Sequence, residues 1–65
     1  MEIKYFQDTD TLLVNFSDRE IVETRDISEN FLIELDAGGN IVSVTIEHAG
    51  EHIDISKLHF DQIPV

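Results

Sequence analysis

The sequence predicts a mostly β fold of the α+β class, an antiparallel β-meander of about five short strands followed by a short C-terminal helix. Val, Ile and Phe recur at every second position through most of the chain, as they do in strands with one buried face. Residues that favour turns interrupt these runs at intervals of about eight to twelve positions, which is typical of antiparallel sheets. The 65 residues predict a single domain, residues 1–65.

The N-terminal half predicts a hairpin followed by an edge strand. Ile3 and Tyr5 alternate with charged residues, and the Asp-rich segment 7–10 predicts a turn into a second strand. The residues that share one face of this second strand are Leu12, Val14 and Phe16. After a turn at residues 17–20, the run at residues 21–27 alternates poorly. Its charges are typical of an edge strand guarded against further pairing, and they are carried by Glu23, Arg25 and Asp26.

Two strongly alternating runs follow, and they predict a second hairpin. The residues expected on one face are Phe31, Ile33 and Leu35 in the first run and Val42, Val44 and Ile46 in the second. Between the runs, residues 36–39 include a pair of glycines, and a hairpin loop needs a residue that can adopt positive φ. A phosphate-binding loop would lead into the N-terminus of a helix instead. The glycines are therefore predicted to turn the chain.

The alternation stops after Glu47. Residues 48–53 are expected to form about one and a half helical turns, and Asp54 or Ser56 is expected to cap another short turn. Leu58 and Phe60 are then expected in a short terminal strand or an apolar hook.

The composition limits the classes of function. Fourteen Asp and Glu against four Lys and Arg give a net charge of −10, which opposes binding to nucleic acids and anionic membranes. A basic protein is the electrostatically favoured partner, although acidity that serves solubility alone is the alternative. Apolar residues make up 42 % of the chain, enough for one small core but not for a deep cleft. No enzyme activity and no cofactor are expected.

The cellular location is predicted from residues that the sequence lacks. The chain contains no cysteine, which fits a reducing compartment. The N-terminus shows no basic stretch followed by an apolar run, and no segment approaches the roughly 18 to 20 apolar residues that a membrane span requires. A cytoplasmic protein is expected.

The order and spacing of these segments resemble a known family. Residues 4–18 (KYFQDTDTLLVNFSD) match its pattern of a Tyr, a short turn, an Asp and alternating apolar residues ending near Ser-Asp. Residues 22–27 (VETRDI) and 32–49 (LIELDAGGNIVSVTIEHA) continue the match, with Leu-Asp, a Gly and an apolar strand closing in Ile-x-x-Ala. From residue 2 to about residue 60, the chain resembles the small prokaryotic family catalogued as domain of unknown function 2283.

The resemblance implies an antiparallel sheet with a short C-terminal helix, assembled as a dimer. In some members it also implies a gene placed beside that of a small toxin-like protein. The family has no established activity, so no catalytic residue carries over. Gly50 stands where the family more often has Ser or another helix-compatible residue, which leaves the helix length open.

One short motif suggests metal chemistry. His48, Glu51 and His52 form the pattern His-x-x-Glu-His, the order of ligand, catalytic carboxylate and ligand in inverted zinc peptidases. On a helix, residues four apart face the same way, so the two imidazoles could approach one ion. Gly50 weakens such a helix by roughly 1 kcal/mol relative to Ala, and zinc hydrolysis also needs a third ligand and a walled cleft. No metal is expected, and a metal-dependent hydrolase or metal-binding protein remains the alternative.

Three acidic residues coincide with the family pattern: Asp10, Glu23 and Asp36. They could form an acid–base pair or a divalent-cation site, but structural roles also explain them. An Asp in a hairpin turn accepts hydrogen bonds from backbone amides two residues on. Glu23 would form a surface ion pair with Arg25 or Lys4 on a neighbouring strand. No catalytic residue is predicted.

A second apolar surface is predicted because Leu13, Leu32 and Ile41, together with Ile21, fall out of phase with the core-facing residues. Unless the C-terminal segment 53–60 covers this patch, it favours dimerisation or binding of another protein. We therefore expect a homodimeric interaction module that binds a basic protein, most concretely an antitoxin-like partner of a small basic toxin. A DNA-mimicking decoy ranks last, because the acidic residues form no stripe.

Overall fold

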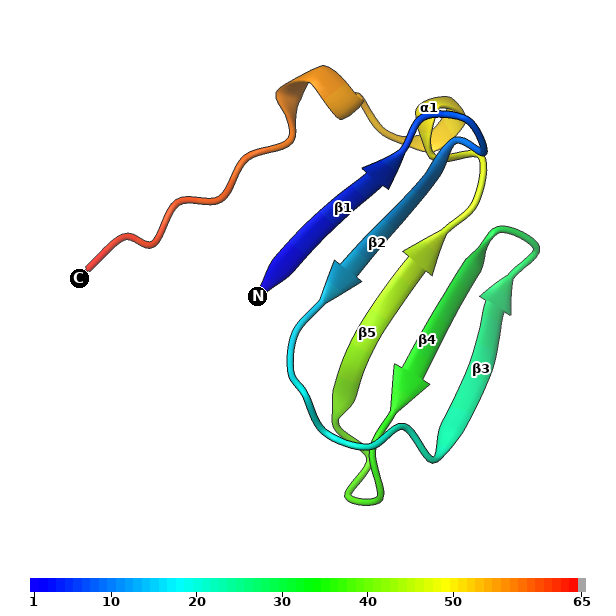
Figure 1. Ribbon diagram of the computed structural model, residues 1–65, viewed down its shortest axis with the longest axis vertical. Coiled ribbons are helices and arrows are strands. Elements are labelled where there is room, and N and C mark those ends of the chain that lie inside the picture. Colours follow the sequence, from blue (N-terminus) through cyan, green and yellow to red (C-terminus); the bar gives the residue numbers. More distant parts are fainter. Residues whose placement is uncertain (65) are drawn as a thin grey trace.

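The computed structural model describes residues 1–64, which form one antiparallel sheet of five strands followed by two short helical turns (Figure 1). The elements are β1 (Glu2–Phe6), β2 (Thr11–Asn15), β3 (Glu23–Ser28), β4 (Phe31–Leu35), β5 (Ile41–Ile46), α1 (Ala49–His52) and the 3-10 turn η1 (Ile55–Lys57). The predicted class, mostly β with a short C-terminal helix, is confirmed.

The strand order across the sheet is β1-β2-β5-β4-β3. The meander is thus limited to β3, β4 and β5, and the β1–β2 hairpin pairs with the far side of β5. Burial explains this order, because β3 is exposed at all six positions and suits an edge, whereas β5 contains the buried Val42 and Ser43. The connection between β2 and β3, residues 16–22, passes the ends of β5 and β4 to reach the opposite edge (Figure 1).

Strand register places the predicted core residues on one face of the sheet, because directly paired residues point the same way. The row nearest α1 consists of Tyr5, Leu12, Ile46 and Phe31, and the next row consists of Ile3, Val14, Val44 and Ile33. We call the surface formed by these eight side chains the apolar face. The predicted alternation of the four apolar strands is confirmed except at Phe16, which follows the end of β2 and is 46 % exposed.

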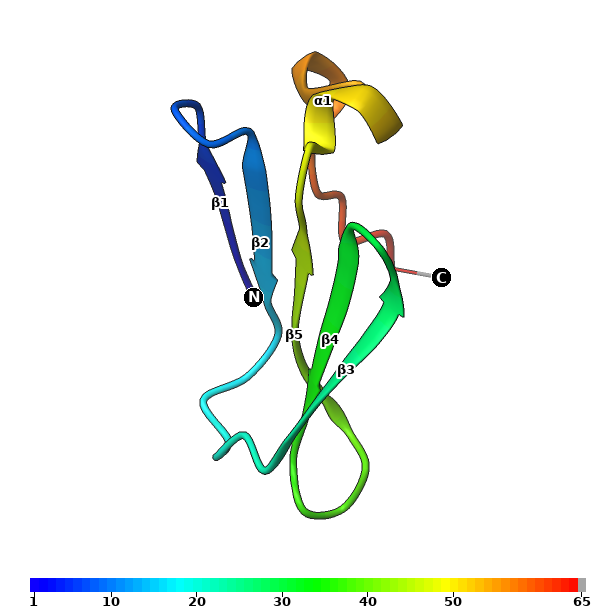
Figure 2. The same cartoon turned by 90° about the vertical axis from the view of Figure 1, so that its right-hand side faces the viewer.

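The sheet is a single layer that buries little of its apolar surface. The principal extents of the molecule are 36 × 33 × 17 Å, and in the edge view residues 1–64 form no second layer along the strands (Figure 2). Buried apolar residues among those described are Leu12, Leu35, Val42 and Ala49. Most of both sheet faces is therefore partly accessible to solvent.

The C-terminal segment follows the prediction only at its start. A short helix is present at α1, and Asp54 caps η1 by accepting hydrogen bonds from the amide of Ser56 at 3.1 Å and its hydroxyl at 2.6 Å. The terminal strand or hook expected at Leu58 and Phe60 is wrong. Beyond η1 the described chain has no regular structure and leaves the sheet beyond β1, so no strand lies beside it to pair with (Figure 1). Within residues 1–64, no helix has the length and apolar character that a membrane span requires.

Leu12 provides a direct test of this core, because its side chain is only 2 % exposed on the strand between β1 and β5. We expect Leu12→Ala to lower the free energy of unfolding by roughly 2–5 kcal/mol, through lost burial and the cavity left behind. Ile27→Ala is the matched control, since Ile27 is 62 % exposed and its truncation should change stability by less than about 0.5 kcal/mol. Urea titration followed by circular dichroism measures both, and equal effects would contradict the assigned core.

Candidate functional site

The histidine motif does not assemble as the sequence suggested. His48 has a φ of 51° and precedes α1 in the left-handed region, so it does not share a helical face with His52. The His48 Nδ1 atom lies 3.7 Å from a carboxylate oxygen of Glu51. The His52 ring instead stands edge-on to Phe31, at 5.4 Å between centroids, and its Nε2 atom lies 3.1 Å from the Asn30 side-chain nitrogen.

This arrangement has a chemical consequence for the metal hypothesis. Within residues 1–64, no group of three or more His, Cys, Asp or Glu side chains is placed to hold a metal ion. His52 takes part in a packing contact at the end of the sheet. The short helix spans only Ala49–His52, so it does not provide the shared helical face on which the metal-binding alternative depended.

Asp10 links two segments that lie far apart in the sequence. Its carboxylate accepts hydrogen bonds from the Tyr5 hydroxyl at 2.6 Å and from the Gly50 amide at 2.9 Å. Its backbone oxygen accepts a third from the Ala49 amide at 2.9 Å. These contacts stand in place of the hydrogen bond expected from the amide two residues on, and Asp10 adopts a left-handed φ of 53° at the turn. The link fixes α1 over the end of the apolar face.

The same contacts shift the titration of both side chains. The hydrogen bond from Tyr5, followed by that from the Gly50 amide, lowers the pKa of Asp10 below its usual 3.8. The hydrogen bond to Asp10 raises the pKa of Tyr5 above its usual 10.0. The link is therefore complete when Asp10 is ionised and Tyr5 is protonated.

The contact with Asp10, rather than helix geometry, explains why position 50 is occupied by glycine. A Cβ atom built on Gly50 would lie 3.2 Å from a carboxylate oxygen of Asp10, tighter than an ordinary van der Waals contact. A larger residue would push the carboxylate away from the amide to which it is bonded. Sequence reasoning treated Gly50 only as a weak helix former, because nothing in the local pattern indicates that Asp10 is its neighbour.

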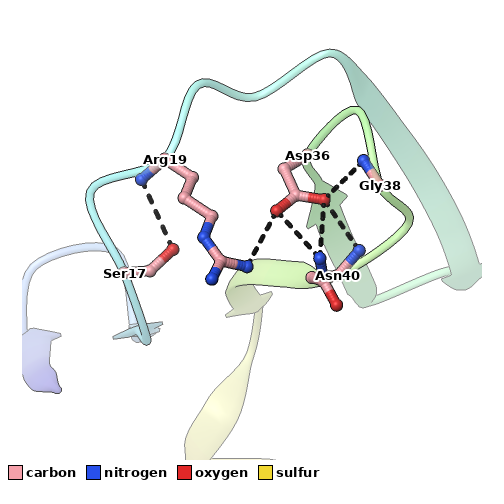
Figure 3. A network of polar contacts seen from close by, with 5 residues as sticks. All are labelled: Ser17, Arg19, Asp36, Gly38 and Asn40. Atoms are coloured by element: carbon pink, nitrogen blue, oxygen red, sulfur yellow. Dashed lines mark hydrogen bonds and ion pairs between the residues drawn. The ribbon is translucent and has the colours of Figure 1, made fainter.

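A second acidic residue, Asp36, organises the loop between β4 and β5 (Figure 3). Its Oδ1 atom accepts hydrogen bonds from the amides of Gly38 at 2.9 Å and Asn40 at 2.8 Å, and Gly39 has a φ of 81°. The hydrogen bonds from Asn40, with that from Arg19, lower the pKa of Asp36. The turn role predicted for Asp36 and the hairpin predicted for the glycines are confirmed.

Arg19 adds a contact that the sequence did not indicate. Its guanidinium lies 3.1 Å from Oδ2 of Asp36, across seventeen positions of sequence (Figure 3). This ion pair holds the crossing connection, residues 16–22, against the β4–β5 hairpin. The Val22 amide supports the same arrangement by donating to the Leu35 carbonyl at 2.9 Å.

Charge is distributed unequally between the two faces of the sheet. Beside the apolar face, β3 contributes Glu23 and Arg25, which form an ion pair with each other along one strand rather than across strands. Arg25 lowers the pKa of Glu23. The other side of the sheet, which we call the second face, carries Glu2, Lys4, Asp26 and Glu34. The strand charges balance on the apolar face and are net negative on the second face.

Of the predicted interaction residues, Leu13 and Leu32 lie together on the second face, whereas Ile41 pairs with Leu35 after an irregularity in the β4–β5 register. Leu13 and Leu32 flank Thr45 in one row across β2, β5 and β4. Ile41 is 48 % exposed and lies beyond the next row, which is polar and consists of Asn15, Ser43 and Glu34. Ile21 lies in the crossing connection. The candidate surface is therefore the Leu13–Thr45–Leu32 row with acidic side chains around it.

Comparison with known proteins places this sheet in a family. The model of a family described as "Protein of unknown function (DUF2283)" matches residues 2–49. The chain belongs to this family. The match covers all five strands and ends at the first residue of α1, short of the extent suggested by the sequence resemblance. No curated protein and no solved structure matches the chain. The matched region thus contains the whole sheet, and residues 50–64 lie outside the match.

The Asp10 link predicts a specific loss of stability in acid. Because the folded-state pKa of Asp10 is lowered, the unfolded chain binds this proton more readily, and stability rises with pH in that range. The contribution is present above about pH 4 and is lost as pH falls through the folded-state pKa. Asp10→Asn should lower the melting temperature at pH 7 and flatten its decline between about pH 5 and pH 3.

Asp8→Asn is the control for this experiment, because Asp8 lies in the same turn outside the link. Tyr5→Phe should reproduce part of the Asp10→Asn effect, since it removes the largest cause of the shifted pKa. Thermal melts at several pH values measure how the melting temperature of each variant depends on pH. An acid decline as steep in Asp10→Asn as in the unchanged protein would exclude the link as its source.

The histidine arrangement predicts weak metal binding. Protein purified without an affinity tag should bind less than one tightly held zinc ion per chain, because His48 and His52 are directed to different partners. Isothermal titration with zinc, repeated with His52→Ala, measures the stoichiometry. One ion per chain that is lost in His52→Ala would restore the metal hypothesis.

Proposed function

We propose that this protein is a small cytoplasmic interaction module that binds a basic protein partner through the second face of its sheet. The observation that carries the proposal is the Leu13–Thr45–Leu32 row, which combines apolar side chains with acidic neighbours on an open sheet surface. A central apolar strip with a charged rim is the usual composition of a protein interface. The proposed role is binding, and it assigns no catalytic residue.

The net charge supports the choice of partner. At −10 for 65 residues, the chain attracts basic molecules over distances comparable to the Debye length. On the second face, Glu2, Asp26 and Glu34 stand against the single base Lys4. Glu34 is held in place by a hydrogen bond from the Ser43 hydroxyl at 2.6 Å. A basic surface would gain both steering and complementary contacts here.

An antitoxin-like role is the most concrete version of this function. In this version the acidic module binds a small basic toxin encoded by a neighbouring gene and covers the surface that the toxin needs for its activity. The net charge of the chain supports the choice of a basic toxin.

The binding proposal is tested with the purified basic product of a neighbouring gene. Replacing Leu13 and Leu32 together by Ser should weaken binding by roughly tenfold or more, because two apolar contacts are lost from the centre of the surface. Ile27→Ser is the matched control, since Ile27 is an exposed apolar residue outside the row. Isothermal titration at low and high salt should also show affinity falling with ionic strength. Binding that is indifferent to the row variant and to salt would reject the proposed surface.

The antitoxin version requires a growth experiment in addition. Expression of the basic protein alone should slow growth, and co-expression with the unchanged chain or Ile27→Ser should restore it, whereas the Leu13 and Leu32 double variant should not. If the basic protein binds but has no effect on growth, the antitoxin role is excluded and the binding role stands.

A further inference from the structure

The chain leaves its own apolar face incompletely covered. Tyr5 and residues 50–56 line a shared shallow groove, so the segment after β5 lies against the β1 end of the row nearest α1. The next row stays open, and its members Val14, Val44 and Ile33 remain partly exposed although they lie on inner strands. Ile3, at the end of that row on β1, is 37 % exposed.

The C-terminal arm, which we define as residues 58–64, carries apolar side chains that also have little cover. Leu58 is 39 % exposed, Phe60 62 % and Ile63 73 %. After η1 the arm leaves the sheet beyond the β1 edge and runs away from it in an extended form (Figure 1). One chain thus contains an open apolar face and an apolar arm that does not reach it.

We propose that the C-terminal arm of one copy lies across the apolar face of a second copy, whose own arm returns the contact, so that the protein is an arm-exchanged homodimer. This inference concerns the apolar face and goes beyond the proposed function, which uses the second face. A reciprocal contact of this kind closes after two copies, because each copy supplies one arm and one face.

The dimensions of the arm and the face agree. Seven residues in extended conformation span at most about 23–25 Å. Five strands spaced about 4.8 Å apart measure roughly 19 Å between their outer axes. The arm is therefore long enough to cross the whole sheet and to place its apolar residues over the open row.

Charge opposes a second copy less on this face than on the other. The chain carries −10 overall, so two copies repel each other over most of their surfaces. On the apolar face the strand charges cancel, because Glu23 and Arg25 pair with each other. In the arm, the His59 Nε2 atom lies 3.0 Å from a carboxylate oxygen of Asp61. Self-association through this face brings few like charges together.

The path of the chain favours exchange over folding back. To cover its own sheet, the arm would have to turn back toward β1 after η1, whereas it continues away from β1 (Figures 1 and 2). Residues 58–63 contain no glycine, the residue that reverses a chain at least steric cost. A second copy receives the arm without any such reversal.

Sedimentation equilibrium on the full chain gives the first test. The unchanged protein should be a dimer, and deletion of residues 58–65 should raise the dimer dissociation constant by at least about a hundredfold, since three apolar side chains lose their cover. Replacing Phe60 and Ile63 together by Ser is a milder variant that leaves the chain length unchanged. Because both residues are highly exposed, circular dichroism of either variant should retain the sheet signal.

Cross-linking then identifies the contact, and the absence of native cysteine makes it specific. A chain carrying Phe60→Cys, mixed with a chain carrying Ile3→Cys, should form a disulfide between copies under mild oxidation. Leu13→Cys is the matched control, because Leu13 pairs with the neighbour of Ile3 but points to the second face. It should cross-link to Phe60→Cys far more slowly.

Each other outcome overturns the inference in a distinct way. A monomer at all concentrations excludes the dimer. A dimer whose dissociation constant is unchanged by arm deletion uses another surface. A chain with both Phe60→Cys and Ile3→Cys that closes only within itself shows that the arm folds onto its own sheet. All three measurements use this protein alone, so they leave the test of the basic partner unaffected.

Discussion

The structure depends on one geometric constraint: a single sheet has two faces, and a chain of 65 residues supplies too little material to cover either one. The residues after β5 amount to one helical turn, one 3-10 turn and an arm that leaves the sheet. Only four apolar side chains are buried among those described. The sheet therefore lacks much of the free energy that a second layer would provide, and the two proposed partners would supply part of it.

Two aspartates compensate in part by joining segments that the sheet does not hold together. Asp10 joins the β1–β2 turn to α1 through a hydroxyl and two amides. At the other end of the sheet, Asp36 joins the β4–β5 loop to the crossing connection through Arg19. Both carboxylates accept several hydrogen bonds in the ionised form, which lowers both pKa values. These acidic residues stabilise the fold at its two ends.

The sequence predicted the features that depend on nearby residues, but it did not predict contacts between residues far apart in the chain. Alternation assigned the faces correctly, because antiparallel pairing preserves which residues share a side. The Asp36 turn was also predictable, since its amide partners lie within four positions. No local sequence pattern indicates the β2–β5 pairing or the hydrogen bond from Gly50 to Asp10. The path of the arm away from the sheet was not indicated either. The positions of His48 and His52 were missed for a local reason, because His48 adopts a left-handed conformation and lies before the helix rather than within it.

The uneven placement of charge makes the two proposed partners compatible with one thin sheet. The apolar face has balanced strand charges, so it suits a second acidic copy, whereas the net-negative second face suits a basic protein. Occupation of one face leaves the side chains of the other untouched, because neighbouring residues in a strand point in opposite directions. A dimer joined through its apolar faces would therefore present two second faces, and each could hold one basic partner. Covering both faces in this way completes the layers that the chain cannot form alone.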